Sequence, residues 1–208
     1  MKRLDDCRLY GILDTGYVCP ERLPEVLREM LAGGIDVVQL RAKGHAAAEV
    51  KPWLEPLHDL TRAADVPLIV NDHPELWPWA DGIHVGQEDA AVSAVRQQMQ
   101  GSGLVGKSTH SLAQAEAASR EAVDYIGFGP LFPTPTKAGR AAIGLETIAE
   151  AHRRVSLPIF CIGGIKRENL EEVMAVGARR VVIVSGILQA VDIAGYVADC
   201  KRLLAADA

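Results

Sequence analysis

The sequence predicts an α/β protein folded as a compact (β/α)8 barrel, the TIM-barrel architecture, from three observations. Short apolar runs alternate with longer segments of helical periodicity, and this alternation occurs eight times within 208 residues. Most of the short runs are rich in β-branched residues, as expected of parallel strands that are buried on both faces. No linker or low-complexity segment divides the series, so we expect a single domain over residues 1–208. A doubly wound open sheet is the alternative.

The expected strands are short apolar runs, and most of them lead into polar or glycine-containing segments. The run at residues 35–40, for example, is mostly apolar and leads directly into Arg41. In chain order, we expect strands at residues 8–13, 37–41, 67–71, 82–85, 104–108, 124–128, 158–162 and 180–184.

The expected helices lie between these strands. The first, Leu23–Ala32, has Pro24 in its first turn and glycines after its end, an asymmetry that is typical of helices. In the second, at residues 46–64, we expect a break near Pro52 and Pro56, because a proline inside a helix removes a backbone hydrogen bond. The other helices are expected at residues 74–79, 89–99, 112–120, 145–154, 167–176 and 187–204.

Composition and charge argue against several classes of protein. Hydrophobic residues make up 49% of the chain and charged residues 24%, which is ordinary for a soluble globular protein. The net charge of −5 argues against general binding of nucleic acid or acidic membranes. The N-terminus lacks the apolar core of a signal peptide, and no apolar run approaches the roughly 20 residues of a membrane span. We therefore expect a cytoplasmic protein with small-molecule substrates, and the sequence leaves a homo-oligomer open.

The four cysteines, at positions 7, 19, 161 and 200, form neither a C-x-x-C pair nor a zinc-binding spacing. We expect them to be free thiols that serve packing.

Polar residues follow most of the expected strands, and in barrels the active site lies at these carboxyl ends. The second strand leads into Gln39, Leu40, Arg41, Ala42 and Lys43. If this run is a strand, Gln39, Arg41 and Lys43 share one face, because side chains alternate along a strand. The planar fork of arginine and the point charge of lysine together suit a diphosphate. A solvated strand end is the alternative.

Two carboxylates, Asp72 and Asp89, follow the third and fourth strands. Hard oxygen ligands beside an anion-binding pair predict Mg²⁺ that bridges to phosphate oxygens of a substrate. The alternatives are a helix N-cap for Asp89 and a cap or turn residue for Asp72.

A second anion site is expected at Gly163-Gly164 and Ser185-Gly186, which follow the last two strands. Barrels often bind a phosphate there through backbone N–H groups, although turns need glycine as well. The longest connection, about residues 129–144, contains Thr134-Pro135-Thr136-Lys137, which could close over an anionic substrate. A mobile surface loop is the alternative.

Other candidates are weaker. His84 lies within the fourth strand and is expected to be a satisfied core histidine, whereas His110 is either an acid–base group or structural. Trp77 and Trp79 are expected to pack. No P-loop, nucleophile elbow or dinucleotide fingerprint is found. Two anion sites without an evident nucleophile–base pair suit the joining of two phosphorylated molecules with diphosphate as the leaving group.

These motifs, in this order, resemble the thiamine-phosphate synthase family, and the similarity extends from Tyr10 to about Ile187. Residues 39–43 resemble the family's signature for a pyrimidine diphosphate, residues 70–72 its Asn-Asp pair and residues 81–89 its metal segment. The segment 129–137 is similar to its highly specific Gly-Pro-x-(aromatic)-Pro-Thr-x-Thr-Lys loop. Residues 162–165 and 184–185 resemble its thiazole-phosphate end.

The resemblance implies that 4-amino-2-methyl-5-(diphosphooxymethyl)pyrimidine and a carboxylated thiazole phosphate are joined to give thiamine phosphate and diphosphate. Diphosphate leaves first, with help from Mg²⁺, and the thiazole nitrogen captures the pyrimidine-methyl cation. The resemblance implies that the pyrimidine diphosphate is bound by Gln39, Leu40, Arg41, Ala42, Lys43, Asn71, Ser108 and Lys137. Of these, it implies a catalytic role for Arg41, Lys43, Ser108 and Lys137. It also implies that Asp72 and Asp89 bind Mg²⁺ and that the thiazole phosphate is bound by Thr134, Pro135, Thr136, Gly164, Val184 and Ser185.

Two other functions are alternatives. A thiazole tautomerase relative of the same fold should lack several diphosphate and metal groups and should depend on a histidine near the position of His110. A non-catalytic paralogue would bind thiamine phosphate without turnover. The presence of Arg41, Lys43, Asp72 and Asp89 favours the synthase. The chain departs from the family pattern in the short interval between the two aspartates, which contains two tryptophans, and in the cysteine at position 161.

Overall fold

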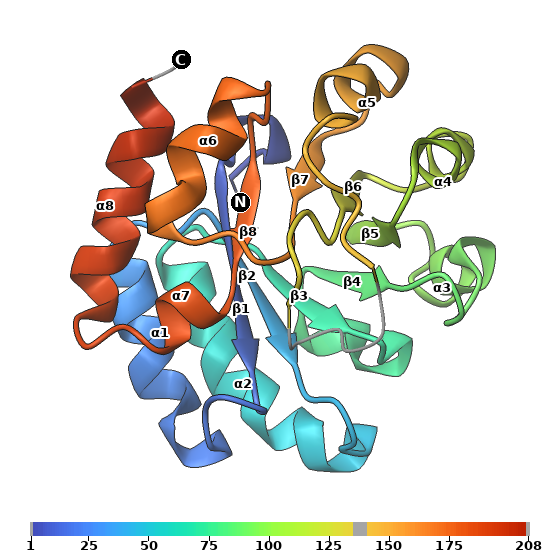
Figure 1. Cartoon of the computed structure of the whole chain (residues 1–208). Helices are drawn as coiled ribbons and strands as arrows, with labels where there is room; N and C mark the ends of the chain where they lie inside the picture. Colours follow the sequence, from blue (N-terminus) through green and yellow to red (C-terminus); the bar gives the residue numbers. More distant parts are fainter. Residues whose placement is uncertain (1, 135–140, 207–208) are drawn as a thin grey trace.

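The computed structural model describes residues 2–134 and 141–206 (Figure 1). Eight parallel strands follow one another around a closed barrel, with β8 paired to β1, so the open-sheet alternative is wrong. The strands are β1 Leu9–Asp14, β2 Val37–Arg41, β3 Leu68–Asn71, β4 Gly82–Val85, β5 Leu104–Thr109, β6 Tyr125–Phe128, β7 Ile159–Cys161 and β8 Val181–Ile183.

The helices surround the barrel as an outer layer (Figure 1). They are α1 Leu23–Ala32, α2 Ala47–Ala63, α3 Val92–Gln98, α4 Leu112–Ala118, α5 Ile148–Arg154, α6 Leu170–Ala175, α7 Ser185–Leu188 and α8 Ile193–Ala206. Short 3-10 helices lie at Leu4–Asp6, Pro20–Arg22, Pro74–Trp79 and Arg167–Asn169. In the part of the chain that the structure describes, no helix combines the length and apolarity needed to cross a bilayer.

Alternation along the strands divides the core into two parts. On β1, Leu9 and Leu13 point outward into the large cluster between barrel and helices. Tyr10 and Ile12 point inward and join a smaller cluster that includes Phe160. Because the side-chain period is two, most strands contribute to both clusters, which explains the apolar runs in the sequence.

Two helix predictions are wrong. The helix α2 is continuous through Pro52 and Pro56. Both prolines are exposed and lie four residues apart, so the missing hydrogen bonds fall on the solvent side, where a helix can bend outward. The helix expected at residues 187–204 is two helices, α7 and α8. Asp192 precedes α8 and accepts a hydrogen bond from the Gly195 N–H at 2.8 Å, so it caps a new helix.

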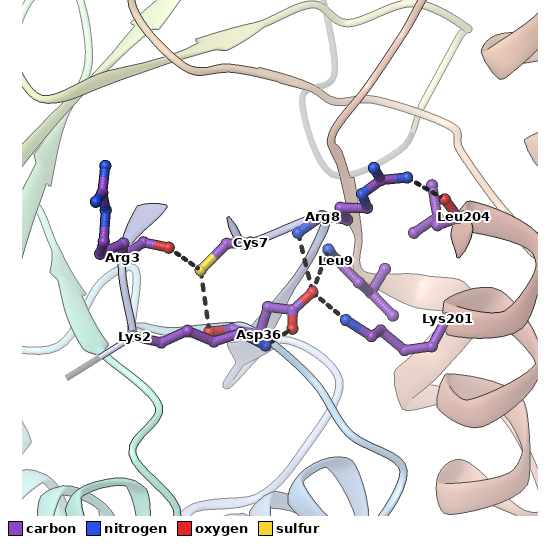
Figure 2. A network of polar contacts seen from close by, with 8 residues as sticks. All are labelled: Lys2, Arg3, Cys7, Arg8, Leu9, Asp36, Lys201 and Leu204. Carbon is purple, nitrogen blue, oxygen red and sulfur yellow. Dashed lines mark hydrogen bonds and ion pairs between the residues drawn. The ribbon is translucent and has the colours of Figure 1, made fainter. Parts of the chain in front are cut away.

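The amino-terminal end of the barrel is closed around the buried carboxylate of Asp36 (Figure 2). It accepts hydrogen bonds from the backbone N–H groups of Arg8 at 2.9 Å and Leu9 at 3.0 Å, and it forms ion pairs with Lys2 and Lys201. Burial alone would raise the pKa of Asp36, but these hydrogen bonds lower it below its ordinary value. This cluster joins the start of the chain, β1 and α8 at the end opposite the catalytic face of such barrels.

Candidate active site

A cavity opens at the carboxyl ends of the strands, where the sequence placed the site. Its floor and walls come from inward-facing side chains of the barrel strands and from the segments that follow β6, β7 and β8. The predicted residues that line it are Gln39, Arg41, Asn71, Ser108, Thr134, Gly164, Val184 and Ser185.

Strand β2 places its predicted residues in different environments. The side chains of Gln39 and Arg41 face the cavity, as the alternation predicts. Leu40 and Ala42 are buried in the core between barrel and helices, so they could meet a substrate through their backbones. Lys43 is exposed beyond the end of the strand and does not line the cavity.

Arg41 is held by a residue that the sequence reasoning missed. Its Nη1 donates a hydrogen bond to Oδ2 of Asp14 at 2.6 Å, and Asp14 is only 2% exposed. The signal was available, because Asp14 is the polar end of the first strand, as Arg41 and Asn71 are of theirs. The ion pair fixes the guanidinium at the cavity mouth while leaving further N–H donors for a ligand.

The two predicted metal carboxylates lie together beside the cavity. The pKa of Asp72 is raised to about 6, first by burial and then by the hydrogen bond and like charge of the neighbouring Asp89 carboxylate. Asp72 has a left-handed φ of 61°. Asp89 Oδ2 accepts a hydrogen bond from the Gly86 N–H at 2.6 Å, and α3 begins at Val92, so Asp89 is not its N-cap.

This arrangement fits a hard divalent cation. Two carboxylates that face each other repel, and a cation between them would relieve the repulsion that raises the pKa of Asp72. The described residues contain no cluster of three or more metal-ligating His, Cys, Asp or Glu side chains. Mg²⁺ commonly uses one or two carboxylates and takes its remaining ligands from water and substrate phosphate. Asp72 and Asp89 could therefore hold Mg²⁺.

The glycines after β7 allow close approach of the loop that follows β6. Gly163 and Gly164 have φ values of 100° and 68°. A Cβ on Gly163 would lie 2.4 Å from the Cα of Pro130, and one on Gly164 would lie 2.6 Å from the Cβ of Phe132. Only glycine satisfies both the conformation and the space. The loop contributes Thr134 to the cavity, whereas Pro135, Thr136 and Lys137 lie outside the described residues.

The two histidines have different surroundings. His84 is 8% exposed, and both of its ring nitrogens contact hydroxyl groups, so the prediction of a satisfied core histidine is confirmed. It also lines the cavity, which the sequence did not indicate. His110 Nδ1 lies 2.5 Å from the carbonyl oxygen of Gly129, at the start of the loop after β6. The two tryptophans at positions 77 and 79 pack against the outer core, as expected.

The closed barrel and its polar mouth place the protein among the (β/α)8-barrel proteins that bind ligands at the carboxyl ends of their strands. The family model for thiamine monophosphate synthase matches residues 9–187, and the chain belongs to this family.

Named relatives and solved structures agree with this assignment. The chain is 39% identical to "Thiamine-phosphate synthase" of Chloroflexus aurantiacus, over 96% of this chain and 93% of the relative. It is 44% identical to the protein of the same name from Streptomyces avermitilis, over 91% and 90%. Thiamine phosphate pyrophosphorylase from Pyrococcus furiosus superposes with a TM-score of 0.88 at 28% identity, covering 98% of each chain. 3-Hexulose-6-phosphate synthase from Salmonella typhimurium, with a TM-score of 0.70 at 14% identity, shares the fold alone.

Proposed function

We propose that this protein is a thiamine-phosphate synthase, a transferase that joins 4-amino-2-methyl-5-(diphosphooxymethyl)pyrimidine to a thiazole phosphate. The observation that carries the proposal is that Gln39, Arg41, Asn71 and Ser108, on three different strands, converge on one cavity in a chain of this family. The products are thiamine phosphate and diphosphate, with carbon dioxide in addition where the thiazole is carboxylated.

The pyrimidine diphosphate occupies the side of the cavity formed by β2, β3 and β5. In this proposal, the diphosphate is bound by Arg41, Lys43 and Lys137. Arg41 is pre-positioned by Asp14, so little side-chain entropy is lost when the anion binds. The pyrimidine ring lies deeper, between Gln39 and Ser108 at the cavity floor.

Asp72 and Asp89 hold Mg²⁺ in this proposal. When bound, the ion neutralises the charge that develops on the departing diphosphate. Asn71 ends β3 at the cavity wall and hydrogen-bonds to Asp72, which lowers the pKa of that carboxyl against the larger raising effect of burial. Arg41 acts in the same direction as Asn71, so both groups favour the ionised form that a metal needs.

The thiazole phosphate is assigned to the opposite side of the mouth. Gly164, Val184 and Ser185 line the cavity after β7 and β8, and Thr134 faces them from the loop after β6. Pro135 and Thr136 complete this group in the proposal. This placement leaves the thiazole nitrogen facing the pyrimidine methylene carbon across the cavity.

The reaction follows from this placement. The carbon–oxygen bond to diphosphate breaks, and its electron pair leaves with the diphosphate while Arg41 and Lys43 stabilise the growing charge. The thiazole nitrogen then donates its lone pair to the pyrimidine methylene carbon. Ile12, Phe160 and Ile162 form an apolar wall that limits capture of the cation by water. Positioning and charge stabilisation thus carry the catalysis, without a protein nucleophile.

Complementation tests the proposal in cells. A bacterial strain that lacks its own thiamine-phosphate synthase needs added thiamine. The wild-type chain should restore growth without thiamine, and the Arg41→Ala variant, expressed to the same level, should not. A tautomerase or a non-catalytic binder would leave the strain dependent on thiamine, and that result would contradict the proposal.

A further inference from the structure

Five side chains form one hydrogen-bonded relay across the interior of the barrel, at the floor of the cavity. Gln39 Nε2 donates to Tyr10 Oη at 2.8 Å, and Tyr10 Oη lies 3.0 Å from Tyr125 Oη. Tyr125 Oη lies 3.1 Å from His84 Nδ1, and His84 Nε2 lies 3.0 Å from Ser108 Oγ. The relay thus ends at two residues that face the pyrimidine in the proposed function, Gln39 and Ser108.

The chemistry of the groups fixes the direction of the first links. The Gln39 amide nitrogen can only donate, so Tyr10 Oη accepts from it. Tyr10 is 2% exposed, and Tyr125 is the other partner of its hydroxyl. If Tyr125 donated to Tyr10, the Tyr10 proton would be buried without an acceptor, which is costly. Tyr10 therefore donates to Tyr125, and Tyr125 donates to His84.

The same reasoning assigns the tautomer of His84. Because Nδ1 accepts the Tyr125 proton, the neutral imidazole carries its own proton on Nε2. Nε2 then donates to Ser108 Oγ, and the hydroxyl proton of Ser108 is directed elsewhere, toward the cavity. Burial raises the pKa of both Tyr10 and Tyr125 above the ordinary value, so both phenols keep the protons that this order requires.

We infer that this relay runs in one direction and sets the hydrogen-bonding polarity of the cavity floor, with Gln39 presenting its carbonyl oxygen as an acceptor and Ser108 its hydroxyl as a donor. Among the described residues, no group donates to the side-chain oxygen of Gln39. Tyr10, Tyr125 and His84 are positioning residues that act through these two ends.

The barrel is built to accommodate the relay. Gly106 on β5 has no side chain, and a Cβ there would lie 2.1 Å from Tyr125 Cζ and 2.6 Å from His84 Nδ1. Phe160 packs edge-on against both tyrosine rings, with centroid distances of 5.4 Å to Tyr10 and 5.6 Å to Tyr125. The room left by Gly106 and the packing of Phe160 together fix the positions of the Tyr10 and Tyr125 hydroxyl groups.

The inference rests on the proposed function for its consequence. A 4-aminopyrimidine presents an amino donor next to a ring-nitrogen acceptor, which matches an acceptor at Gln39 and a donor at Ser108. The 4-oxo analogue presents an acceptor next to an N–H donor, the reverse order. The relay should therefore select the amino form, because a mismatched ring leaves buried polar groups unpaired.

Nuclear magnetic resonance of protein labelled with ¹⁵N-histidine tests the relay without any substrate. The chain has 6 histidines, and the signals of His84 are those lost in the His84→Asn variant. At neutral pH, we expect a neutral ring with its proton on Nε2 and an unprotonated Nδ1. A proton on Nδ1, whether in the other tautomer or in the doubly protonated ring, would overturn the inference.

The Tyr125→Phe variant tests the link itself, because it keeps the ring that packs on Phe160 and removes the hydroxyl. His84 should then populate both tautomers. The same change in Tyr196→Phe removes a hydroxyl that accepts from the Arg167 N–H outside the barrel interior, and it should leave the His84 signals unchanged. An unchanged His84 spectrum in Tyr125→Phe would overturn the inference. Where this variant does not fold, the His84 tautomer seen in the wild-type spectrum is the deciding result.

Substrate discrimination separates the two proposals. The wild-type kcat/KM should favour the 4-amino over the 4-oxo pyrimidine diphosphate by at least about 100-fold, and this ratio should fall in Tyr125→Phe. A wild type that uses both analogues equally would overturn the inference while leaving synthase activity intact. If neither analogue is converted, the proposed function fails, whereas the tautomer of His84 still decides the direction of the relay.

Discussion

Arg41 and Asp14 form an ion pair at the mouth of the barrel, with Nη1 of the arginine 2.6 Å from Oδ2 of the aspartate. The two residues are direct partners in the register of β2 with β1, so the strands themselves bring them together. Both side chains are largely buried, at 17% and 3% exposure. A buried aspartate that orients an arginine at a cavity leaves the guanidinium ready for a second anion.

Loss of Arg41 should therefore impair catalysis far more than folding. The Arg41→Ala variant should lower kcat/KM for the pyrimidine diphosphate by about 100- to 1,000-fold, as expected when one charged donor to a developing anion is removed. Steady-state kinetics measure the loss of catalysis, and circular dichroism measures whether the variant still folds. The control is Arg22→Ala, which removes an exposed arginine from an ion pair on the surface. Equal kcat/KM in Arg41→Ala and wild type would contradict the assignment.

Asp14→Asn tests the positioning of Arg41 separately. The amide keeps the shape of the side chain but loses the charge that holds the guanidinium, so kcat/KM should fall by about 10- to 100-fold. The KM for the pyrimidine diphosphate should rise, while the KM for the thiazole phosphate should not. A variant with unchanged kinetics would show that the ion pair does not prepare the site.

Asp89→Ala should remove most of the activity together with its response to Mg²⁺. The rate at saturating Mg²⁺ should fall by at least about 100-fold, because several kcal/mol of charge stabilisation are lost. Titration of activity against Mg²⁺ provides the measurement, and Asp199→Asn, a change in a surface carboxylate paired with Arg202, is the matched control. A normal Mg²⁺ titration in Asp89→Ala would count against the metal assignment.

Asp36 should matter for stability and not for chemistry. Asp36→Ala should lower the free energy of unfolding by about 3 kcal/mol at pH 7, because two backbone N–H groups and two lysines lose their shared acceptor. Its folded-state pKa is lowered, so its contribution is complete above the ordinary value of 3.8 and is lost as the pH falls through the folded-state pKa.

Urea unfolding across this pH range tests the assignment of Asp36. The difference between wild type and Asp36→Ala should shrink in acid. A difference that stays constant down to pH values well below about 3.9 would contradict the role of the ionised carboxylate.

Gly106→Ala should disturb the interior of the barrel. The added methyl group would meet Tyr125 and His84 at distances that require them to move, which should destabilise the fold by about 1–3 kcal/mol. On the next strand, Gly127→Ala is the control, because a Cβ there would make an ordinary contact of 3.7 Å with His84. Thermal unfolding compares the two, and equal Tm values would show that the space at Gly106 is not needed.

Much of the fold follows from the sequence because a barrel repeats one local pattern. Each apolar run is buried on both faces, so its length and β-branched content predict a strand without knowledge of its neighbours. The break expected at Pro52 and Pro56 fails because helix packing depends on which face a proline occupies. The helix expected at residues 187–204 fails because Asp192 was not recognised as a cap.

The sequence predicted those site residues whose place in the cavity depends only on their position along a strand. Gln39, Arg41, Asn71 and Ser108 reach the cavity because each lies on the inward face at a carboxyl end. The relay could not be predicted, because the register and curvature of the whole barrel bring together side chains as distant in sequence as Tyr10 and Tyr125, which are 115 residues apart.

The central claim is the joining of two phosphorylated substrates, and one assay tests it most directly. Purified protein is mixed with Mg²⁺, the pyrimidine diphosphate and the thiazole phosphate, and thiamine phosphate and diphosphate are measured together over time. We predict that both products appear in equal amounts and that omission of either substrate abolishes thiamine phosphate. Isomerisation of the carboxylated thiazole without thiamine phosphate, or binding of thiamine phosphate without turnover, would contradict the account.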